Sequence, residues 1–216
     1  MLLALDTATQ YATIALHDGK RVLAELNWRS QRRHTVELAP QVDNLLRLAG
    51  LASTDLTVLG VSIGPGSYTG TRIALSYAKG VALARNVSLI GISTLDVLAY
   101  PHLPARQPLC VMVAAGRGRY GWAMYAPDVI QPHRLSPFRL DTLSTLLPQI
   151  TPPLIFVGEL SAEDRARLNA EWNREATIVP PARALRRAGA LAELAWARLQ
   201  VGDVNDPVTL SPIYLG

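Results

Sequence analysis

The stretch GPGSYTGTR, residues 64–72, is the part of the sequence that most resembles a binding loop. A glycine-rich turn before a helix can hold phosphate with its backbone amides. However, no lysine follows Gly70, and the spacing fits neither the P-loop GxxxxGK[ST] nor the dinucleotide motif GxGxxG. We interpret the stretch as a loop that shapes the backbone, with Ser67 or Thr69 capping the next helix. The candidate residues of this loop are Gly64, Pro65, Gly66, Ser67, Tyr68, Thr69, Gly70 and Arg72.

Residues that could hold a metal or act as nucleophiles are few and scattered. No two histidines are four residues apart, so no HxxxH metal pair can form on a helix. The single cysteine, Cys110, lies in the apolar run PLCVMVA, which favours a small buried side chain over a nucleophile. We therefore predict no metal site and no catalytic residue. The four histidines are His17, His34, His102 and His133.

The composition is that of a globular protein that binds no membrane. The chain has 216 residues, of which 49% are hydrophobic and 18% charged, enough to bury a core in one large domain or two lobes of about 100 residues. The first residues carry no basic leader, and no apolar run approaches the roughly 18 residues of a membrane span. We expect a cytoplasmic protein.

The net charge of +4 comes mainly from arginine, since Lys20 and Lys79 are the only lysines. This balance is compatible with an RNA partner but does not demonstrate one. The arginine clusters lack interleaved aromatic residues, so we expect them to be solvated polar faces. These clusters are Arg29, Arg32 and Arg33, and Arg183, Arg186 and Arg187.

The hydrophobic pattern of the first half predicts an antiparallel meander followed by alternating helices and strands. Gly50 can end the first helix, and Pro40 either kinks it or marks an early turn. The crossover through the second helix should make the strands on either side of it parallel. The expected elements are strands at 2–6, 11–19 and 21–28, a helix at 34–50, a strand at 56–64, a helix at 71–84 and a strand at 87–94.

The second half repeats this plan weakly. Ser161 and Asp164 form a capping box at the start of one helix. The expected elements are strands at 109–115 and 120–127, a helix at 140–150, a strand at 153–158, a helix at 161–172, the short segment TIVP at 177–180 and a helix at 182–199. We predict an α/β fold of two mixed-sheet lobes, residues 1–100 and 101–216, with the last helix free to pack back on the first lobe. The boundary is expected in the proline-rich stretch 100–108.

The helix at 71–84 carries several small residues and has one apolar face. Small side chains permit the close approach of another helix or of a sheet. Either this face packs on its own sheet, or apolar surface remains for a partner. The small residues are Ala74, Ala78, Gly80, Ala82 and Ala84, and the apolar face consists of Ile73, Tyr77 and Val81.

Five motifs, spread in order over nearly the whole chain, resemble the bacterial TsaB family, also called YeaZ. They are LALDTAT at the start, HTVELAP at 34–40, GPGSYTGTRIAL at 64–75, IGISTLDVLA at 90–99 and PIYLG at the end. The resemblance implies a two-lobed fold of the actin, sugar-kinase and Hsp70 type (the ASKHA superfamily) with duplicated ribonuclease-H-like sheets.

The resemblance also implies a role in making threonylcarbamoyladenosine, the modified adenosine beside the anticodon of tRNAs that read codons beginning with A. Members are partners of the catalytic subunit TsaD and of the ATPase TsaE, meet tRNA through that complex, and lack a catalytic centre of their own. ATP or ADP at the joint with TsaD is a further implication. Without TsaD, we expect the apolar surface to pair with itself in a homodimer. The expected partner interface is Ile73, Ala74, Tyr77, Ala78 and Val81 with Val42 and Leu45.

Asp6 and Thr7 are the candidates for a nucleotide site within this fold. The kinase-like fold needs a glycine-rich phosphate hairpin after the first strand, and DTATQYAT from Asp6 contains no glycine. The turn with Gly116 and Gly118 offers arginines instead of a carboxylate. We expect a degenerate site in which Asp6 either braces the hairpin or touches a metal. The alternative function is an ATP-dependent kinase of a small metabolite, which would bind magnesium-ATP as the isolated chain.

Three further features of the sequence lead to predictions. Thr35 is expected to cap the helix that begins near His34, or else one of this pair contacts RNA or a partner. The sequence departs from the family pattern at Ala114, where an aspartate is usual, which puts in doubt any contact made through that segment. It also stops directly after IYLG, without the arginine-bearing tail of many relatives.

Overall fold

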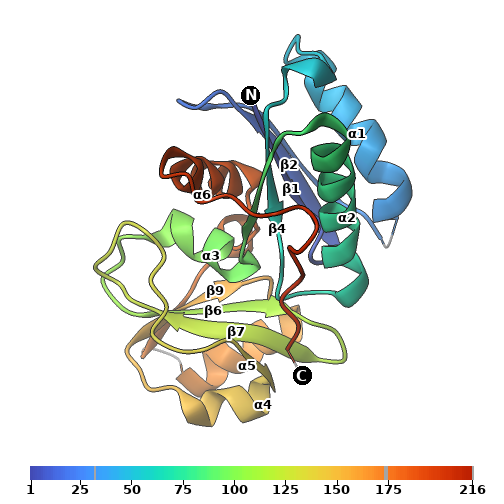
Figure 1. Ribbon diagram of the computed structural model, residues 1–216. Helices are drawn as coiled ribbons and strands as arrows, with labels where there is room; N and C mark the ends of the chain where they lie inside the picture. Colours follow the sequence, from blue (N-terminus) through green and yellow to red (C-terminus); the bar gives the residue numbers. More distant parts are fainter. Residues whose placement is uncertain (32, 173–174, 216) are drawn as a thin grey trace. The chain divides into compact units, whose positions relative to one another are not determined.

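The computed structural model describes residues 1–31, 33–172 and 175–215, and the chain forms two compact units (Figure 1). Unit 1 combines Met1–Val97 with Arg186–Tyr214, and unit 2 is built from Leu98–Leu185. The sequence suggests a division near residue 100 and leaves the last helix free to pack on the first lobe; here the last helix and the segment after it belong to unit 1.

Unit 1 contains a five-stranded mixed sheet in the order β3-β2-β1-β4-β5. β1 pairs with β2, and β2 with β3, in antiparallel register, while β1, β4 and β5 run parallel. This is the meander and the parallel crossover that the sequence predicts. The elements are β1 (Leu2–Asp6), β2 (Tyr11–His17), β3 (Val22–Arg29), α1 (His34–Leu48), η1 (Ser53–Asp55), β4 (Val58–Ser62), α2 (Tyr68–Arg85), β5 (Ser88–Ile92), α3 (Thr94–Ala99) and α6 (Ala188–Gln200).

The central strands of this sheet are buried on both faces, which explains their nearly continuous apolar sequence. α1 and α2 lie on one face and α6 on the other (Figure 1). The close packing of α6 depends on small side chains: a Cβ atom on Gly60 would lie 3.0 Å from the Cβ of Ala195. Pro40 lies inside α1, and Gly50, with a φ of +66°, follows its end.

Unit 2 contains a second five-stranded sheet in the order β10-β9-β6-β7-β8. The elements are η2 (Tyr100–His102), β6 (Leu109–Ala114), β7 (Arg119–Tyr125), β8 (Arg139–Thr142), α4 (Leu143–Leu146), η3 (Leu147–Gln149), β9 (Leu154–Gly158), α5 (Ala162–Trp172), β10 (Ala176–Ile178) and η4 (Pro181–Arg183). The prediction of a helix from residue 140 is wrong at its start, because 140–142 belong to the edge strand β8. The capping contact before α5 is present, with the Asp164 amide donating to Ser161 Oγ at 3.0 Å.

The two sheets have the same plan, which confirms the predicted α/β fold with a duplicated mixed sheet. In each, the first strand of the unit is central, two antiparallel strands follow on one side, and two parallel strands complete the other side. Among the helices of the described residues, none is long and apolar enough to cross a lipid bilayer.

Candidate functional site

The loop at residues 64–72 packs tightly against the turn between β1 and β2. A Cβ atom on Gly66 would lie 2.5 Å from the carbonyl oxygen of Ala8, and one on Gly70 would lie 2.2 Å from that of Thr7. The Ser67 amide also donates to the Ala8 carbonyl at 2.7 Å. Backbone approaches this close require glycine. The loop therefore directs its backbone toward the protein's own first hairpin.

The same loop sets the start of α2. Ser67 is the N-cap and its Oγ accepts from the Gly70 amide at 3.3 Å, so of the two predicted capping residues Ser67 is the one in place. The helix begins at Tyr68, three residues earlier than predicted, because this cap precedes the last glycine of the motif. Thr7 Oγ1 donates to the Gly70 carbonyl at 2.6 Å and accepts from the Ala74 amide at 3.1 Å. Through these two hydrogen bonds, Thr7 fixes the position of the first turn of α2.

Asp6 is paired with an arginine. Its Oδ2 accepts from Arg186 Nε at 2.9 Å, and its Oδ1 accepts from the Ala8 amide at 2.7 Å. Arg186 also donates to Thr9 Oγ1 at 2.7 Å and to the Tyr11 carbonyl at 2.6 Å. The side chains of Arg186 and Asp6 are 1% and 0% exposed. Of the two alternatives for Asp6, this contact is that of a brace for the first hairpin.

The prediction of a solvated arginine cluster is therefore wrong for Arg186, although Arg183 and Arg187 are exposed. In the other predicted cluster, Arg29 and Arg33 are exposed, and Arg32 lies outside the described residues. No local sequence pattern distinguishes Arg186 from its neighbours, because its partner Asp6 lies at the other end of the chain.

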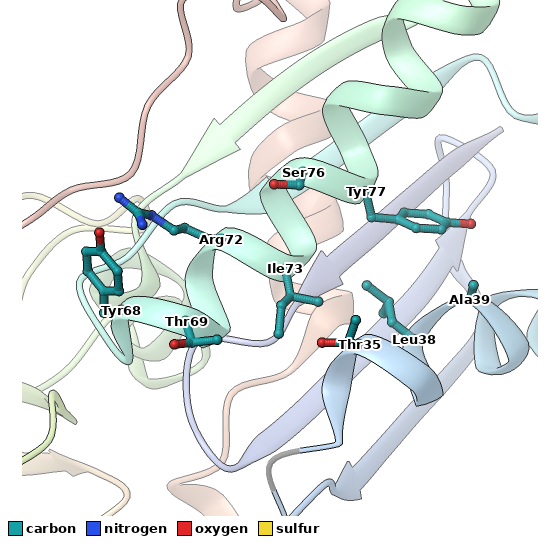
Figure 2. A pocket seen from close by; sticks show the side chains of 9 residues that line it. All are labelled: Thr35, Leu38, Ala39, Tyr68, Thr69, Arg72, Ile73, Ser76 and Tyr77. Carbon is teal, nitrogen blue, oxygen red and sulfur yellow. The ribbon is translucent and has the colours of Figure 1, made fainter.

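An apolar groove of about 410 Å³ lies between α1 and α2 (Figure 2). Side chains from both helices line it, and the exposed part of the 64–72 motif forms one end. Burial raises the pKa of Tyr77 in its wall, and the negative charge of Asp43 raises it further. The lining residues are Thr35, Leu38, Ala39, Tyr68, Thr69, Arg72, Ile73, Ser76 and Tyr77.

The structure divides the predicted partner interface into a surface part and a core part. Ile73 and Tyr77 line the groove, and Val81 is half-buried one turn further along α2. The other four predicted residues pack in the core of unit 1 and offer no surface: Ala74 and Ala78 at 0% exposed, Val42 at 3% and Leu45 at 2%. Periodicity identified the helix but could not say which of its two apolar faces covers the sheet. It also missed the lining residues Leu38, Ala39 and Ser76.

His34 and Thr35 are placed differently from each other. The prediction that Thr35 caps α1 is wrong, because the helix begins at His34 with Arg33 as its N-cap residue and no side-chain cap. Thr35 is exposed at the groove. His34 is 5% exposed, and its Nε2 lies 2.7 Å from the carbonyl oxygen of Thr9. Burial lowers the pKa of His34.

The remaining candidate positions are not among the residues that line the groove. Cys110 is fully buried in β6, and burial raises the pKa of its thiol. Ala114 ends the same strand and is exposed, and the turn after it has positive φ angles at Gly116 and Gly118. Among the described residues, no group of three His, Cys, Asp or Glu side chains lies close enough to hold a metal ion.

Comparison with known proteins finds similarity to proteins that are named for one tRNA modification. Residues 26–130 match the family described as "TsaD: tRNA N6-adenosine threonylcarbamoyltransferase". The chain is 36% identical over 129 residues to the "tRNA threonylcarbamoyladenosine biosynthesis protein TsaB" of Escherichia coli, which covers 59% of this chain and 55% of that protein. It therefore spans little more than half the length of this relative. With the TsaB protein of Haemophilus influenzae it shares 28% identity over 222 residues, covering 99% of this chain and 92% of that protein.

Solved structures show the same fold. The structure of "YeaZ from Pseudomonas aeruginosa" superposes with a TM-score of 0.79 at 24% sequence identity, covering 99% of each chain. A second Pseudomonas aeruginosa structure, described as having similarity to peptidase YEAZ, gives a TM-score of 0.78 at 23% identity. At this level of identity the likeness establishes the fold.

Proposed function

Because this chain belongs to the TsaB (YeaZ) family, we propose that it is a non-catalytic subunit of tRNA threonylcarbamoyladenosine biosynthesis. In this proposal it docks the threonylcarbamoyltransferase TsaD and activates it, together with the ATPase TsaE. The adenosine that is modified lies beside the anticodon, and the tRNA binds to the complex that contains TsaD and this protein.

The observation that carries this proposal is the placement of the 64–72 motif. Its backbone packs on the first hairpin, while its exposed side chains, with Ile73 and Tyr77, form an apolar groove. Apolar grooves between two helices are surfaces on which a partner helix can bury an apolar face. The placement of this motif beside the groove supports a role for the groove in docking a protein partner.

A second observation supports a non-catalytic role. Asp6, the acidic residue at the position where the kinase-like fold would need one, already accepts hydrogen bonds on both carboxylate oxygens, one of them from the buried Arg186. A carboxylate neutralised in this way is poorly suited to bind a magnesium-nucleotide complex. We infer that ATP or ADP binds the complex with TsaD and not the isolated chain.

The test is reconstitution of threonylcarbamoyl-tRNA formation with TsaD, TsaE and the synthase that supplies threonylcarbamoyl-AMP, with and without this protein. We expect product formation to depend on the protein, while the protein alone turns over no ATP. ATP turnover by the isolated chain with no effect on tRNA modification would instead support the kinase alternative.

Docking is tested separately with surface variants of α2. The double variant Ile73→Ala/Tyr77→Ala is expected to weaken TsaD binding at least about 30-fold, since apolar anchors at the centre of an interface often contribute 2 kcal/mol or more. The matched control is Leu83→Ala, because Leu83 is 58% exposed on the same helix but does not line the groove. The same double variant should also prevent the self-association that we expect for the isolated chain. Equal binding by the double variant and the control would refute the docking site.

A further inference from the structure

Arg72 is the one charged residue among the nine described residues that line the groove. Its guanidinium lies 3.7 Å from the ring centroid of Tyr68 and 5.2 Å from that of Tyr214. Its Nε donates a hydrogen bond to Tyr214 Oη. Within the described residues no carboxylate pairs with Arg72, in contrast to Arg33, Arg47, Arg186 and Arg187. The arginine is therefore a positive charge held in place by two aromatic side chains.

The tail of the chain, residues 208–214, holds Tyr214 in contact with Arg72. The Ile213 amide donates to the Ile63 carbonyl at 2.7 Å, so the residue before Tyr214 is tied to the loop that precedes the motif. Lys79, two turns along α2 from Arg72, donates to the carbonyls of Val208 and Leu210 at 3.0 Å each. Gly64 leaves room for the tail, since a Cβ atom there would lie 3.1 Å from the carbonyl oxygen of Ile213. These contacts of residues 208–213 hold Tyr214 beside Arg72.

A side chain held in this way is prepared for binding. A free arginine loses about 2 kcal/mol of rotamer entropy when it is fixed, and here part of that cost is already met in the unbound protein. Stacking on tyrosine leaves the charge intact, and the hydrogen bond to Tyr214 raises the pKa of Arg72 still further. Arg72 is positively charged throughout the physiological pH range.

The position of Arg72 on α2 determines which part of a docked helix it would contact. Residues four apart on a helix form rows, so Ile73 and Tyr77 make an apolar row and Arg72 and Ser76 a polar row beside it. Figure 2 shows Arg72 and Tyr68 at one end of the groove, with Ile73 and Tyr77 further along α2. A helix that covers the apolar row and extends over the neighbouring polar row removes Arg72 from water. Desolvating an unpaired cation is costly, whereas a partner carboxylate offsets that cost.

We propose that Arg72, held between Tyr68 and Tyr214, selects the partner helix by pairing with an aspartate or glutamate on it. The occupant is an amphipathic helix of the docked protein, with an apolar row over Ile73 and Tyr77 and a carboxylate on the neighbouring row. This inference rests on the proposed function, in which the groove between α1 and α2 docks a protein.

The groove favours a protein over a nucleic acid as the occupant. Nucleic-acid affinity rests on several cations that contact phosphates, and the described lining supplies one. The lining also includes the apolar side chains of Leu38, Ala39 and Ile73, which gain free energy by contact with other apolar groups. An exposed tyrosine such as Tyr68 can stack on a base, so binding of tRNA is measured as a competing outcome.

The experiment measures the affinity of the full-length protein for purified TsaD from the same organism. Arg72→Gln is expected to weaken binding at least about 30-fold, the effect of removing one partner from a desolvated charge pair. Arg72→Lys should recover only part of this, since an ammonium lacks the planar fork that stacks and binds carboxylate. Tyr214→Phe keeps the ring but loses the hydrogen-bond acceptor, and should weaken binding about threefold to tenfold. The control is Arg21→Gln, since Arg21 is 78% exposed in the turn between β2 and β3.

A charge exchange provides the strongest support. Arg72→Glu should abolish binding, and one Asp→Arg or Glu→Arg substitution on the docking helix of TsaD should restore it. Arg72→Gln binding TsaD as tightly as Arg21→Gln would overturn the proposal, and so would loss of tRNA binding by the isolated Arg72→Gln protein with TsaD affinity unchanged. If Ile73→Ala/Tyr77→Ala still weakens TsaD binding in those cases, the docking site stands and only the role of Arg72 fails.

Discussion

Arg186 and Asp6, which are 180 residues apart in the sequence, form a fully buried ion pair with Nε and Oδ2 2.9 Å apart. Through Thr9 and the Tyr11 carbonyl, the same guanidinium also holds the turn and the start of the next strand. Arg186 directly precedes the N-cap residue of α6. The pair therefore joins the last helix of the chain to its first hairpin within unit 1.

Replacing one member of this ion pair measures how much the pair contributes to the free energy of unfolding. Arg186→Met leaves the Asp6 carboxylate buried without its cation, so we expect the free energy of unfolding to fall by about 3–5 kcal/mol. Urea denaturation followed by circular dichroism measures this. Adding Asp6→Asn to Arg186→Met should recover part of the loss, because the double variant buries no uncompensated charge.

The neighbouring pair provides the control. Arg187 pairs with Glu25; the Arg187 side chain is 58% exposed and that of Glu25 is 12% exposed, and ion pairs with an exposed member contribute about 0–1 kcal/mol. Arg187→Met should therefore change the free energy of unfolding by no more than about 1 kcal/mol. Equal losses for Arg186→Met and Arg187→Met would contradict the distinction between a pair with both members buried and a pair with an exposed arginine.

Most of the fold could be predicted from local patterns, since strands buried on both faces are continuous apolar runs and α1 and α2 repeat apolar residues at helical spacing. β8 (Arg139–Thr142) was missed because an edge strand of four residues, none of them buried, leaves no apolar run. The placement of α6 was left open because which sheet a helix covers is decided by contacts distant in sequence, such as Ala195 against Gly60.

The site was predicted less completely than the fold. The motif at 64–72 indicated the loop that sets the start of α2, and the apolar row of Ile73 and Tyr77 was identified by its spacing. Tyr214 joins Arg72 across 142 residues, and nothing in the sequence near either residue indicates the contact. The misassignment of Arg186 has the same cause: burial of a charge depends on a partner that may lie anywhere in the chain.

Two glycines of α2 should respond in opposite directions to alanine. Gly70→Ala places a Cβ atom 2.2 Å from the carbonyl oxygen of Thr7, so the hairpin or the helix must shift. We expect a loss of about 1–3 kcal/mol in the free energy of unfolding, the usual cost of overpacking. At Gly80 no atom lies within 4 Å of the added Cβ, and Gly80→Ala should stabilise the helix by about 0.5–1 kcal/mol. Thermal unfolding of both variants measures the difference, and a gain in both would contradict the close approach at Thr7.

Because Ala78 is a core residue, a charged side chain at this position should destabilise the protein. Its side chain is 0% exposed against the sheet of unit 1, so Ala78→Glu buries a carboxylate without a partner and is expected to lower the free energy of unfolding by several kcal/mol. Leu83→Glu introduces the same charge at a residue that is 58% exposed and should change stability by less than about 0.5 kcal/mol. Loss of partner binding by an Ala78→Glu protein that unfolds like the wild type would show instead that Ala78 faces the partner.

His34 should make the stability of the protein depend on pH near neutrality. Burial lowers its pKa below the ordinary value of 6.5, an effect that outweighs the opposing hydrogen bond to the Thr9 carbonyl. The neutral ring donates Nε2–H to that carbonyl, and its Nδ1 is buried without a partner in the described part of the chain. Below pH 6.5 the unfolded chain binds a proton at this position that the folded chain does not. The free energy of unfolding therefore falls as the pH falls, from a value that is complete above pH 6.5.

The decline attributable to His34 can reach about 1.4 kcal/mol per pH unit, the limit for one proton. His34→Gln keeps an amide that can donate to Thr9 but does not titrate, so its stability should change less between pH 7 and pH 5 than that of the wild type. His133→Gln is the control, because His133 is exposed, and it should follow the wild-type curve. Urea denaturation at half-unit pH steps gives the three curves. A constant offset between His34→Gln and the wild type over this range would mean that His34 contributes contacts but takes up no proton on unfolding.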